Sequence, residues 1–337
     1  MCPDQHNPPN AVDIICNPSR VSMSPTYGEY LKIEELLKLQ TGIDGDESKL
    51  SNDELHFIIV HQNFELWFKL IISELRCTRD ILDTDYVEET KIPQAVHHMG
   101  RVIETFRLMA LQWKVVETLE PQDFLNFREK LGTASGFESF QMRKMEALMG
   151  EIWVDGKPVS GKAWESFKEK KSLYEVICEW LHRTPIQGST LGSSSDGETV
   201  SNFVESFLEK HKSLYPDHNA EAREFLKPED KVHRGRSGLL FIESYRELPL
   251  LAWPRKLIST LIELEEVMVL WRSSHARMVE RVIGRRVGTG GSSGVDYLDM
   301  TAKYRVFVDL WSVRSILIKK SALPELQNPE FYGFKGD

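Results

Sequence analysis

Two histidines fall on the apolar faces of predicted helices, where an imidazole ring needs a partner. His61 follows Phe57 by four residues and precedes Phe64 by three, so these side chains share one helix face. His275 lies four residues after Trp271 on a second apolar stripe. A buried polar group without a hydrogen bond costs about 1–3 kcal/mol. Each imidazole therefore requires either a hydrogen-bond partner or a metal ion.

The pattern of the two histidines favours haem over other metal centres. A lone histidine on an apolar face is more often a core residue with satisfied hydrogen bonds, and that interpretation stays open. Facing helices of a bundle nevertheless commonly build cofactor sites. The sequence has no HExxH motif, and Glu179 with His182 gives one Glu-x-x-His pair where a di-iron bundle needs two. A porphyrin supplies four nitrogens and requires one axial imidazole, which a single histidine provides.

An arginine and a glycine-rich segment could hold a polar substrate. Arg128 shares a helix face with Phe124 and Phe127, which directs its guanidinium toward the apolar side. It either snorkels or forms a structural ion pair, or it clamps a substrate carboxylate through paired hydrogen bonds. The segment GTGGSSG at 288–294 follows a helix and lacks the lysine of a phosphate-binding loop. A mobile lid over 285–296 and a plain linker are the two remaining interpretations.

Helices must position these residues, because apolar side chains recur at helical spacing through most of the chain. The helix at 53–82 carries His61, and the longest helix, at 254–283, carries His275. Further helices are predicted at 29–40, 93–119, 121–131, 137–149, 162–181, 200–212, 228–245 and 304–317. Residues 184–199 read as a flexible loop, and 151–159 could hold a small hairpin. The prediction is an all-α fold with one helical domain at 27–337 after a flexible tail at 1–26.

Composition and charge exclude several classes of protein. The 337 residues include 42 Lys and Arg against 51 Asp and Glu, a net charge of −9, which disfavours a nucleic-acid partner. No apolar run is long enough to span a membrane, and the N-terminus lacks the pattern of a signal peptide. The four cysteines have no CxxC spacing and form no disulfide framework. We therefore expect a cytoplasmic protein with reduced cysteines and no membrane partner.

Several segments resemble, in order, segments of the tryptophan 2,3-dioxygenase family. They are YGEYL at 27–31, HQNFELWFK at 61–69, FRE at 127–129 followed by ASGF at 134–137, WRSSH at 271–275 followed by GTGGSSG at 288–294, and YRVFVDL at 304–310. The resemblance implies a nearly all-helical bundle that assembles as a homotetramer. It implies haem b with Fe(II) in the active form, and insertion of both atoms of O₂ across the indole C2–C3 bond of L-tryptophan. The product would be N-formyl-L-kynurenine.

The resemblance also implies roles for the residues around the haem. His275 matches the axial ligand of the iron, and Trp271 matches a residue beside the haem. His61 matches the distal histidine near the indole N–H, and Ser135 matches a distal-side hydroxyl close to the haem. His61 and Ser135 would thus be the catalytic residues. Thr289 matches the lid residue that contacts the amino-acid head group.

The remaining implied residues bind the substrate. Phe57 and Phe124 match walls of the indole pocket, which suits an aromatic ring. Arg128 matches the anchor of the substrate carboxylate, which suits a planar guanidinium. Tyr27 and Tyr30 match residues that reach into the site of a neighbouring subunit.

Two positions depart from the family's usual PASGFQS segment. Thr133 replaces the proline and Glu138 replaces the glutamine, and both fall near the expected distal side of the haem. One alternative is therefore a haem-dependent monooxygenase or dioxygenase that acts on a modified tryptophan in a natural-product pathway. A non-catalytic haem sensor or carrier is another. The retained GTGGSSG segment favours the tryptophan dioxygenase.

Overall fold

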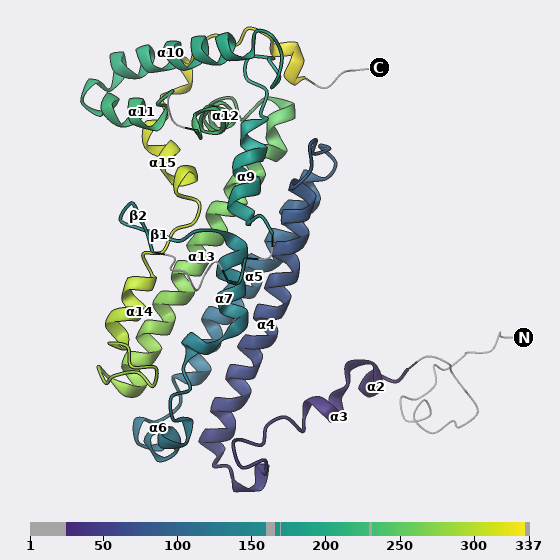
Figure 1. Ribbon diagram of the computed structural model, residues 1–337, viewed down its shortest axis with the longest axis vertical. Coiled ribbons are helices and arrows are strands. Elements are labelled where there is room, and N and C mark those ends of the chain that lie inside the picture. The colour runs from purple at the N-terminus through teal and green to yellow at the C-terminus, as the bar shows by residue number, and fades with distance from the viewer. Residues whose placement is uncertain (1–24, 160–165, 169, 229–230, 334–337) are drawn as a thin grey trace, which may run out of the picture. The chain divides into compact units, whose positions relative to one another are not determined.

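A computed structural model of the protein describes residues 25–159, 166–168, 170–228 and 231–333. Helices dominate these residues (Figure 1), and their one sheet is an antiparallel pair formed by β1 (Trp153–Val154) and β2 (Lys157–Pro158). The all-α prediction is therefore confirmed. In the predicted hairpin, Asp155 and Gly156 have φ values of 48° and 76°, which a tight two-residue turn between right-twisted strands requires. No helix in the described residues is long and apolar enough to cross a membrane.

The chain divides into two compact units, residues 1–55 and 56–337. In the first unit, the helix expected at 29–40 is instead two short helices, α2 (Tyr27–Leu31) and α3 (Ile33–Leu36). They are separated by Lys32, whose φ of 55° is incompatible with a continuous α-helix. The tail expected at 1–26 falls almost wholly outside the described residues. The single domain expected at 27–337 stays a prediction.

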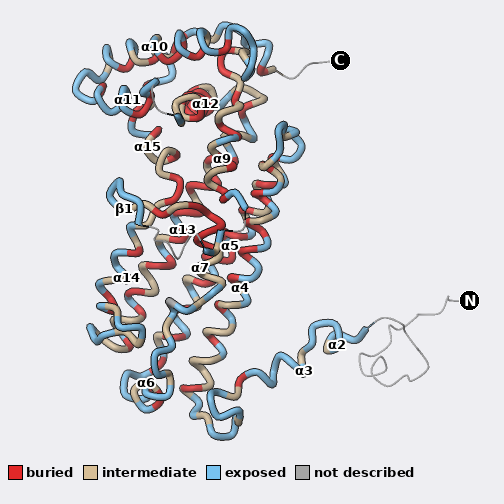
Figure 2. The backbone as a smooth tube through the Cα atoms, in the orientation of Figure 1, coloured by how far each residue is buried: buried red, intermediate tan, exposed pale blue. Residues whose placement is uncertain are grey.

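The second unit is built around long helices that run side by side in Figure 1. They are α4 (Asn52–Leu82), which belongs to this unit from His56 onward, α5 (Ile92–Val116) and α13 (Ala252–Ile283), and α13 packs extensively against α5. The predicted helices at 53–82, 93–119 and 254–283 are therefore confirmed to within a few residues. Buried residues colour long stretches of these helices red in Figure 2. The buried apolar side chains that line the shared faces include Phe64, Phe68, Ile71, Leu75, Phe106, Trp113, Leu261, Leu264 and Trp271.

Shorter helices complete the second unit. α6 (Pro121–Arg128), α7 (Phe140–Met149) and α14 (Val295–Thr301) lie toward one end of the long helices, and α14 packs on α13 (Figure 1). At the other end lie α9 (Leu173–His182), α10 (Asp196–Leu214), α11 (Asn219–Phe225), α12 (His233–Ser244) and α15 (Val308–Ile316). Among these helices, α12 packs against α9 and α15, and α10 packs against α11.

Side-chain caps account for several boundaries that the sequence placed wrongly. Of the helix predicted at 162–181, residues 162–165 and 169 lie outside the described residues, and α9 begins at Leu173, because Ser172 and Glu175 form a reciprocal capping box. The helix predicted at 137–149 begins at Phe140, because the Ser139 hydroxyl accepts a hydrogen bond from the Met142 amide. Apolar periodicity reports which face is buried and carries little information about the residue at which a helix starts.

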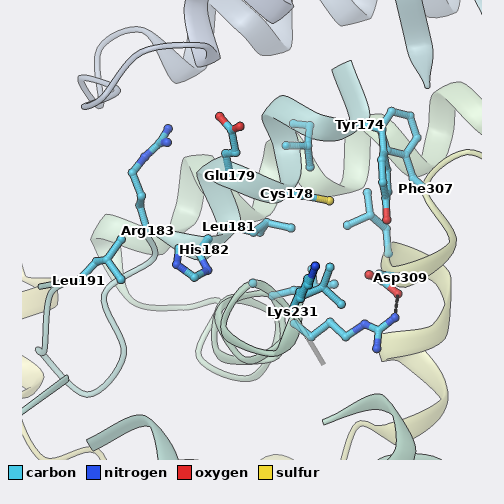
Figure 3. Close-up of a pocket in the computed structure, with 16 residues that line it drawn as sticks. Tyr174, Cys178, Glu179, Leu181, His182, Arg183, Leu191, Lys231, Phe307 and Asp309 are labelled. Carbon is cyan, nitrogen blue, oxygen red and sulfur yellow. Dashed lines mark ion pairs between the residues drawn. The ribbon is translucent and has the colours of Figure 1, made fainter. Parts of the chain in front are cut away.

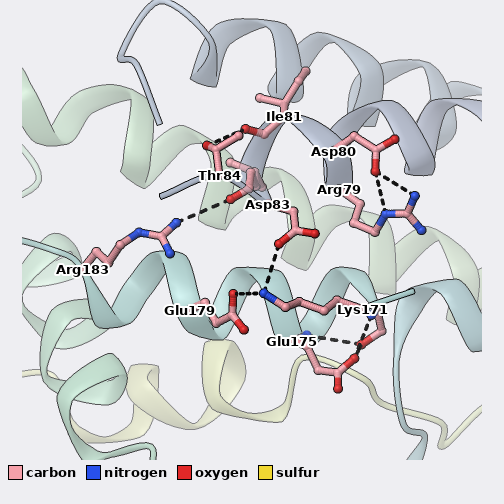
Figure 4. Close-up of polar contacts among 11 residues, drawn as sticks. Arg79, Asp80, Ile81, Asp83, Thr84, Lys171, Glu175, Glu179 and Arg183 are labelled. Atoms are coloured by element: carbon pink, nitrogen blue, oxygen red, sulfur yellow. Dashed lines mark hydrogen bonds and ion pairs between the residues drawn. The ribbon is translucent and has the colours of Figure 1, made fainter. Parts of the chain in front are cut away.

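Charged side chains tie neighbouring helices together. The Lys171 ammonium lies between the end of α4 and α9 (Figure 4), at 3.1 Å from Asp83 Oδ1 and 2.7 Å from Glu179 Oε2. Deeper in the unit, Arg272 Nη2 of α13 donates to Glu146 Oε1 of α7 at 3.0 Å, and both side chains are buried. A buried ion pair of this kind adds little net stability but leaves an unpaired charge if one partner is removed. It therefore fixes how α13 and α7 can pack.

A buried carboxylate joins α13 to the segment that precedes α15. Glu265 Oε1 accepts hydrogen bonds from the backbone amides of Val306 at 2.5 Å and Phe307 at 3.3 Å, and Oε2 accepts one from Trp311 Nε1 at 2.7 Å. Burial raises the pKa of Glu265, while these donors act in the opposite direction. This carboxylate satisfies three donors that would otherwise be buried without partners.

Replacing this carboxylate with an apolar side chain should strongly destabilise the fold. We expect Glu265→Leu to lower the free energy of unfolding by about 3 kcal/mol or more, because each buried donor left unsatisfied costs about 1–3 kcal/mol. The neighbouring Glu266 is exposed, so Glu266→Leu is the matched control and should change stability by less than about 0.5 kcal/mol. Denaturant unfolding of both variants measures this, and equal effects would show that the Glu265 contacts carry no stability.

Candidate active site

His61 lies on α4 with a defined hydrogen bond and an uncharged ring. Its Nδ1 is 2.7 Å from the Phe57 carbonyl oxygen, one turn earlier. Because a carbonyl oxygen can only accept, Nδ1 carries the proton and Nε2 is left as an acceptor. Burial is the main cause that lowers the pKa of His61, so the ring stays neutral at neutral pH. The imidazole can therefore receive a hydrogen bond from a donor such as an indole N–H.

His275 lies on α13 against an aromatic wall. Its ring stacks on Trp113 of α5, with 4.3 Å between ring centroids and 5° between planes, and Trp271 lies 6.1 Å away. Neither of its ring nitrogens hydrogen-bonds to any residue that the structure describes. Burial lowers the pKa of His275 to about 3, and the charges of His61 and Arg272 act in the same direction. A neutral imidazole is the form that ligates metals.

These observations bring together the two histidines that the sequence singled out. The Phe64 ring centroid lies 6.4 Å from that of His61 and 4.2 Å from that of Trp113, on which His275 stacks, so α4 and α13 present both histidines to one region of the bundle. The simple alternative, a core histidine with its hydrogen bonds satisfied, describes His61 in part, through its bond to the Phe57 carbonyl. It does not describe His275, which has no such bond within the described part of the chain.

Aromatic rings from α4 and α6 form a continuous cluster beside His61. The Phe57 ring centroid lies 3.9 Å from that of His61 and 5.9 Å from that of Phe124. Phe127 lies 5.6 Å from Phe57 and 5.2 Å from Phe124. Phe124 and Phe127 are both buried. The predicted walls of an indole pocket, Phe57 and Phe124, are thus neighbours, and the cluster offers the flat apolar surface that an aromatic ring prefers.

Arg128 and Thr289 connect α6 and the loop after it to the glycine-rich segment. Arg128 Nη2 donates to the Val287 carbonyl oxygen at 2.6 Å, and Thr289 Oγ1 donates to the Ala134 carbonyl oxygen at 2.6 Å. Arg128 forms no ion pair with any described residue, so the structural ion pair that the sequence left open is not found there. Its remaining N–H groups are the ones that could bind a substrate carboxylate.

The remaining positions that the sequence analysis singled out are half-buried or exposed. Ser135 is partly buried and directly follows Ala134, so it belongs to the loop that Thr289 contacts. Thr133 and Glu138, the two departures from the family pattern, are exposed. Tyr27 and Tyr30 belong to the first unit, where their side chains are 77% and 75% exposed.

Two further residues shape the site, and neither was predicted from the sequence. Glu65, one turn after His61, accepts hydrogen bonds from Ser139 Oγ at 2.6 Å and Gln141 Nε2 at 3.1 Å, which fixes the start of α7 to α4. Trp113 stacks on His275 but reads in the sequence as an ordinary core residue. A charged residue inside an apolar run was the available signal for Glu65, whereas nothing local distinguishes Trp113.

The available donors fit a cofactor that brings most of its own ligands. Across the described residues, no group of three or more His, Cys, Asp or Glu side chains could hold a bare metal ion. His275 offers a neutral nitrogen, and the indole N–H groups of Trp113 and Trp271 are buried without partners within the described part. A porphyrin requires one axial imidazole and is flat enough to lie against aromatic rings. Haem therefore fits these residues, whereas a bare ion would lack ligands.

Comparisons with known proteins identify the family of this chain. The family model for tryptophan 2,3-dioxygenase matches residues 16–224 and 205–317. The chain is 40% identical to a tryptophan 2,3-dioxygenase of Sorangium cellulosum, over 94% of this chain and 89% of that protein. It is 40% identical to tryptophan 2,3-dioxygenase 2 of Ralstonia nicotianae, over 92% of this chain and 97% of that protein. A tryptophan 2,3-dioxygenase-like protein of Xanthomonas campestris is 39% identical over 63% of this chain. The chain belongs to the tryptophan 2,3-dioxygenase family.

Proposed function

We propose that this chain is a haem-dependent dioxygenase that inserts both atoms of O₂ across the indole C2–C3 bond of L-tryptophan and yields N-formyl-L-kynurenine. The observation that carries this proposal is the pairing of His275 and His61, two neutral imidazoles on facing helices, in a chain of this family. The relatives named tryptophan 2,3-dioxygenase, which align along nearly the whole chain, support the same reaction.

His275 would hold the iron of one haem b per subunit, with Fe(II) in the active form. Trp271 and Trp113 would border the macrocycle, because both pack beside the His275 ring. Ser135 would lie on the distal side, on the loop that Thr289 contacts through Ala134. Bound haem supplies the iron chemistry that activates O₂, and the protein supplies orientation and a dry pocket.

The remaining residues would bind and orient L-tryptophan. The indole ring would lie against Phe57 and Phe124, and its N–H would donate to His61 Nε2, the acceptor nitrogen. The free N–H groups of Arg128 would bind the substrate carboxylate through charge-assisted hydrogen bonds. Thr289 would contact the amino-acid head group from the glycine-rich segment. Because His61 is held neutral, it would act as a hydrogen-bond acceptor in the catalytic step.

The protein would act as a homotetramer in the cytoplasm. Apolar side chains exposed on the long helices support subunit contacts, since Leu66 is 48% exposed, Leu111 67% and Leu270 57%. Tyr27 and Tyr30 would reach the site of a neighbouring subunit. Cys77 and Cys178 are free thiols, as in a reducing compartment. The net charge of −9 disfavours a nucleic-acid partner.

Product analysis tests the reaction directly. The reduced haem-loaded protein is mixed with L-tryptophan and ¹⁸O₂, and the product is identified by mass spectrometry. We expect one product that contains two labelled oxygen atoms. A product with a single labelled atom would instead support a monooxygenase, and haem spectra that persist without any turnover would support a sensor.

His275→Ala should lose haem or hold it weakly, because the variant lacks the imidazole nitrogen that would bind the iron. The ratio of Soret absorbance to protein absorbance measures the haem content. His97→Ala removes an exposed histidine and is the matched control, which should load haem as the unmodified protein does. Full loading of His275→Ala with an unchanged spectrum would contradict the ligand assignment.

Arg128→Ala should weaken L-tryptophan binding about 10- to 100-fold, because a charge-assisted hydrogen bond contributes about 1.5–3 kcal/mol. Indole analogues without a carboxylate should bind nearly as before. Thr289→Ala should have a smaller effect, about fivefold, because a neutral hydrogen bond contributes about 1 kcal/mol. Equilibrium titrations of the haem-loaded variants measure these affinities. A larger loss for Thr289→Ala than for Arg128→Ala would show that the glycine-rich segment is the main anchor.

A further inference from the structure

A cavity of about 340 Å³ lies between α9, α12 and the start of α15, and none of its lining residues belongs to the candidate active site. Figure 3 shows α9 side chains on one side of the cavity and those of α12 and α15 opposite. Small-molecule sites are typically apolar cavities of about 300–1,000 Å³ with a few placed polar groups. This cavity therefore has the dimensions of a binding site for one small molecule.

The walls of the cavity are mostly apolar. Ile177 and Leu181 line it from α9, Leu239 from α12, Phe307 from the residue before α15, and Leu310 from α15 itself. All five side chains are buried elements of the core. They give the cavity a fixed apolar surface, which suits a ring or a branched hydrocarbon body.

Three polar side chains of the α9 wall, those of Tyr174, Cys178 and His182, are uncharged. Burial raises the pKa of the Cys178 thiol to about 11, and it raises the pKa of the Tyr174 phenol as well. The phenol and the thiol are hydrogen-bonded to each other. Burial and the nearby Arg234 lower the pKa of His182, so its imidazole is neutral. These groups can accept or donate a hydrogen bond but neither attract nor repel a charged ligand strongly.

The carboxylates at the cavity are already paired. Asp309 Oδ1 lies 3.0 Å from Arg236 Nη2 (Figure 3), and Glu179 Oε2 lies 2.7 Å from Lys171 Nζ. Lys231 also lines the cavity, and within the described part of the chain its ammonium has neither an ion pair nor a hydrogen bond. The unbalanced charge at this site is therefore positive, which favours an anionic ligand.

We propose that this cavity binds a small monocarboxylate with an apolar ring or branched body, and that Lys231 pairs with its carboxylate. An amino acid fits less well, because neither paired carboxylate is free to receive an ammonium group. The site is separate from the one proposed for L-tryptophan, and its ligand class is different. The inference does not depend on the dioxygenase reaction.

Calorimetric titration of the haem-loaded protein with 4-phenylbutyrate at low ionic strength tests the site. We expect one molecule to bind per subunit. Val232→Trp, which fills the cavity from its partly buried rim, should weaken binding at least tenfold. Lys231→Met should weaken it about five- to tenfold. Lys319→Met, at another exposed lysine, is the charge-matched control and should change the affinity by less than about twofold.

Two comparisons distinguish this site from a purely apolar cavity and from the tryptophan site. The uncharged amide 4-phenylbutyramide should bind the unmodified protein only as tightly as 4-phenylbutyrate binds Lys231→Met, and equal binding of acid and amide would overturn the anionic ligand class. Arg128→Ala should leave 4-phenylbutyrate binding unchanged, and a loss there would place the acid in the tryptophan site. Absence of saturable binding, or binding that neither Val232→Trp nor Lys231→Met weakens, would overturn the proposal.

Discussion

The site depends on one imidazole that burial keeps neutral. His275 lies on the core helix α13, stacked on Trp113, and its nitrogens have no hydrogen-bond partner among the described residues. A neutral imidazole without a hydrogen-bond partner can bind a metal. A porphyrin iron would bind this nitrogen, and the macrocycle would lie against the same aromatic rings.

The surrounding structure fixes the position of this imidazole. α13 packs along α5, the helix that carries Trp113. Two polar side chains of α13 also bond to other segments of the chain. Glu265 holds the segment before α15, and Arg272, one turn before His275, pairs with Glu146 of α7. Since both carboxylates are buried, moving the helix would expose unsatisfied donors or an unpaired charge. The helix is in this way restricted to a single packing arrangement.

The opposite side of the site is assembled from loops and short helices, and hydrogen bonds to neighbouring segments hold them. Glu65 fixes the start of α7 to the helix that carries His61. Thr289 and Arg128 each bond to a backbone carbonyl across the gap between α6 and the glycine-rich segment. Contacts of this kind can open and close without disturbing the core helices. The two imidazoles thus lie on core helices, whereas Arg128 and Thr289 lie on segments that can move apart. This combination suits a substrate that joins an indole to an amino-acid head group.

The sequence predicted the long helices and the two histidine positions because apolar periodicity reports directly on buried faces. It failed at Lys32, where a left-handed residue divides one predicted helix, and at Ser172, where a cap delays a helix start. It also missed the stacking of Trp113 on His275, because that contact joins helices distant in sequence. The bonds of Arg128 and Thr289 are tertiary contacts as well, so residue spacing could suggest their roles but not their partners.

Resonance Raman spectroscopy of the ferrous haem-loaded protein tests the assignment of His275 most directly. We predict an iron–histidine stretching band that shifts when the protein is grown with ¹⁵N-labelled histidine. A ferrous haem with no band sensitive to this label would contradict the proposed axial ligand, and with it the interpretation of the site.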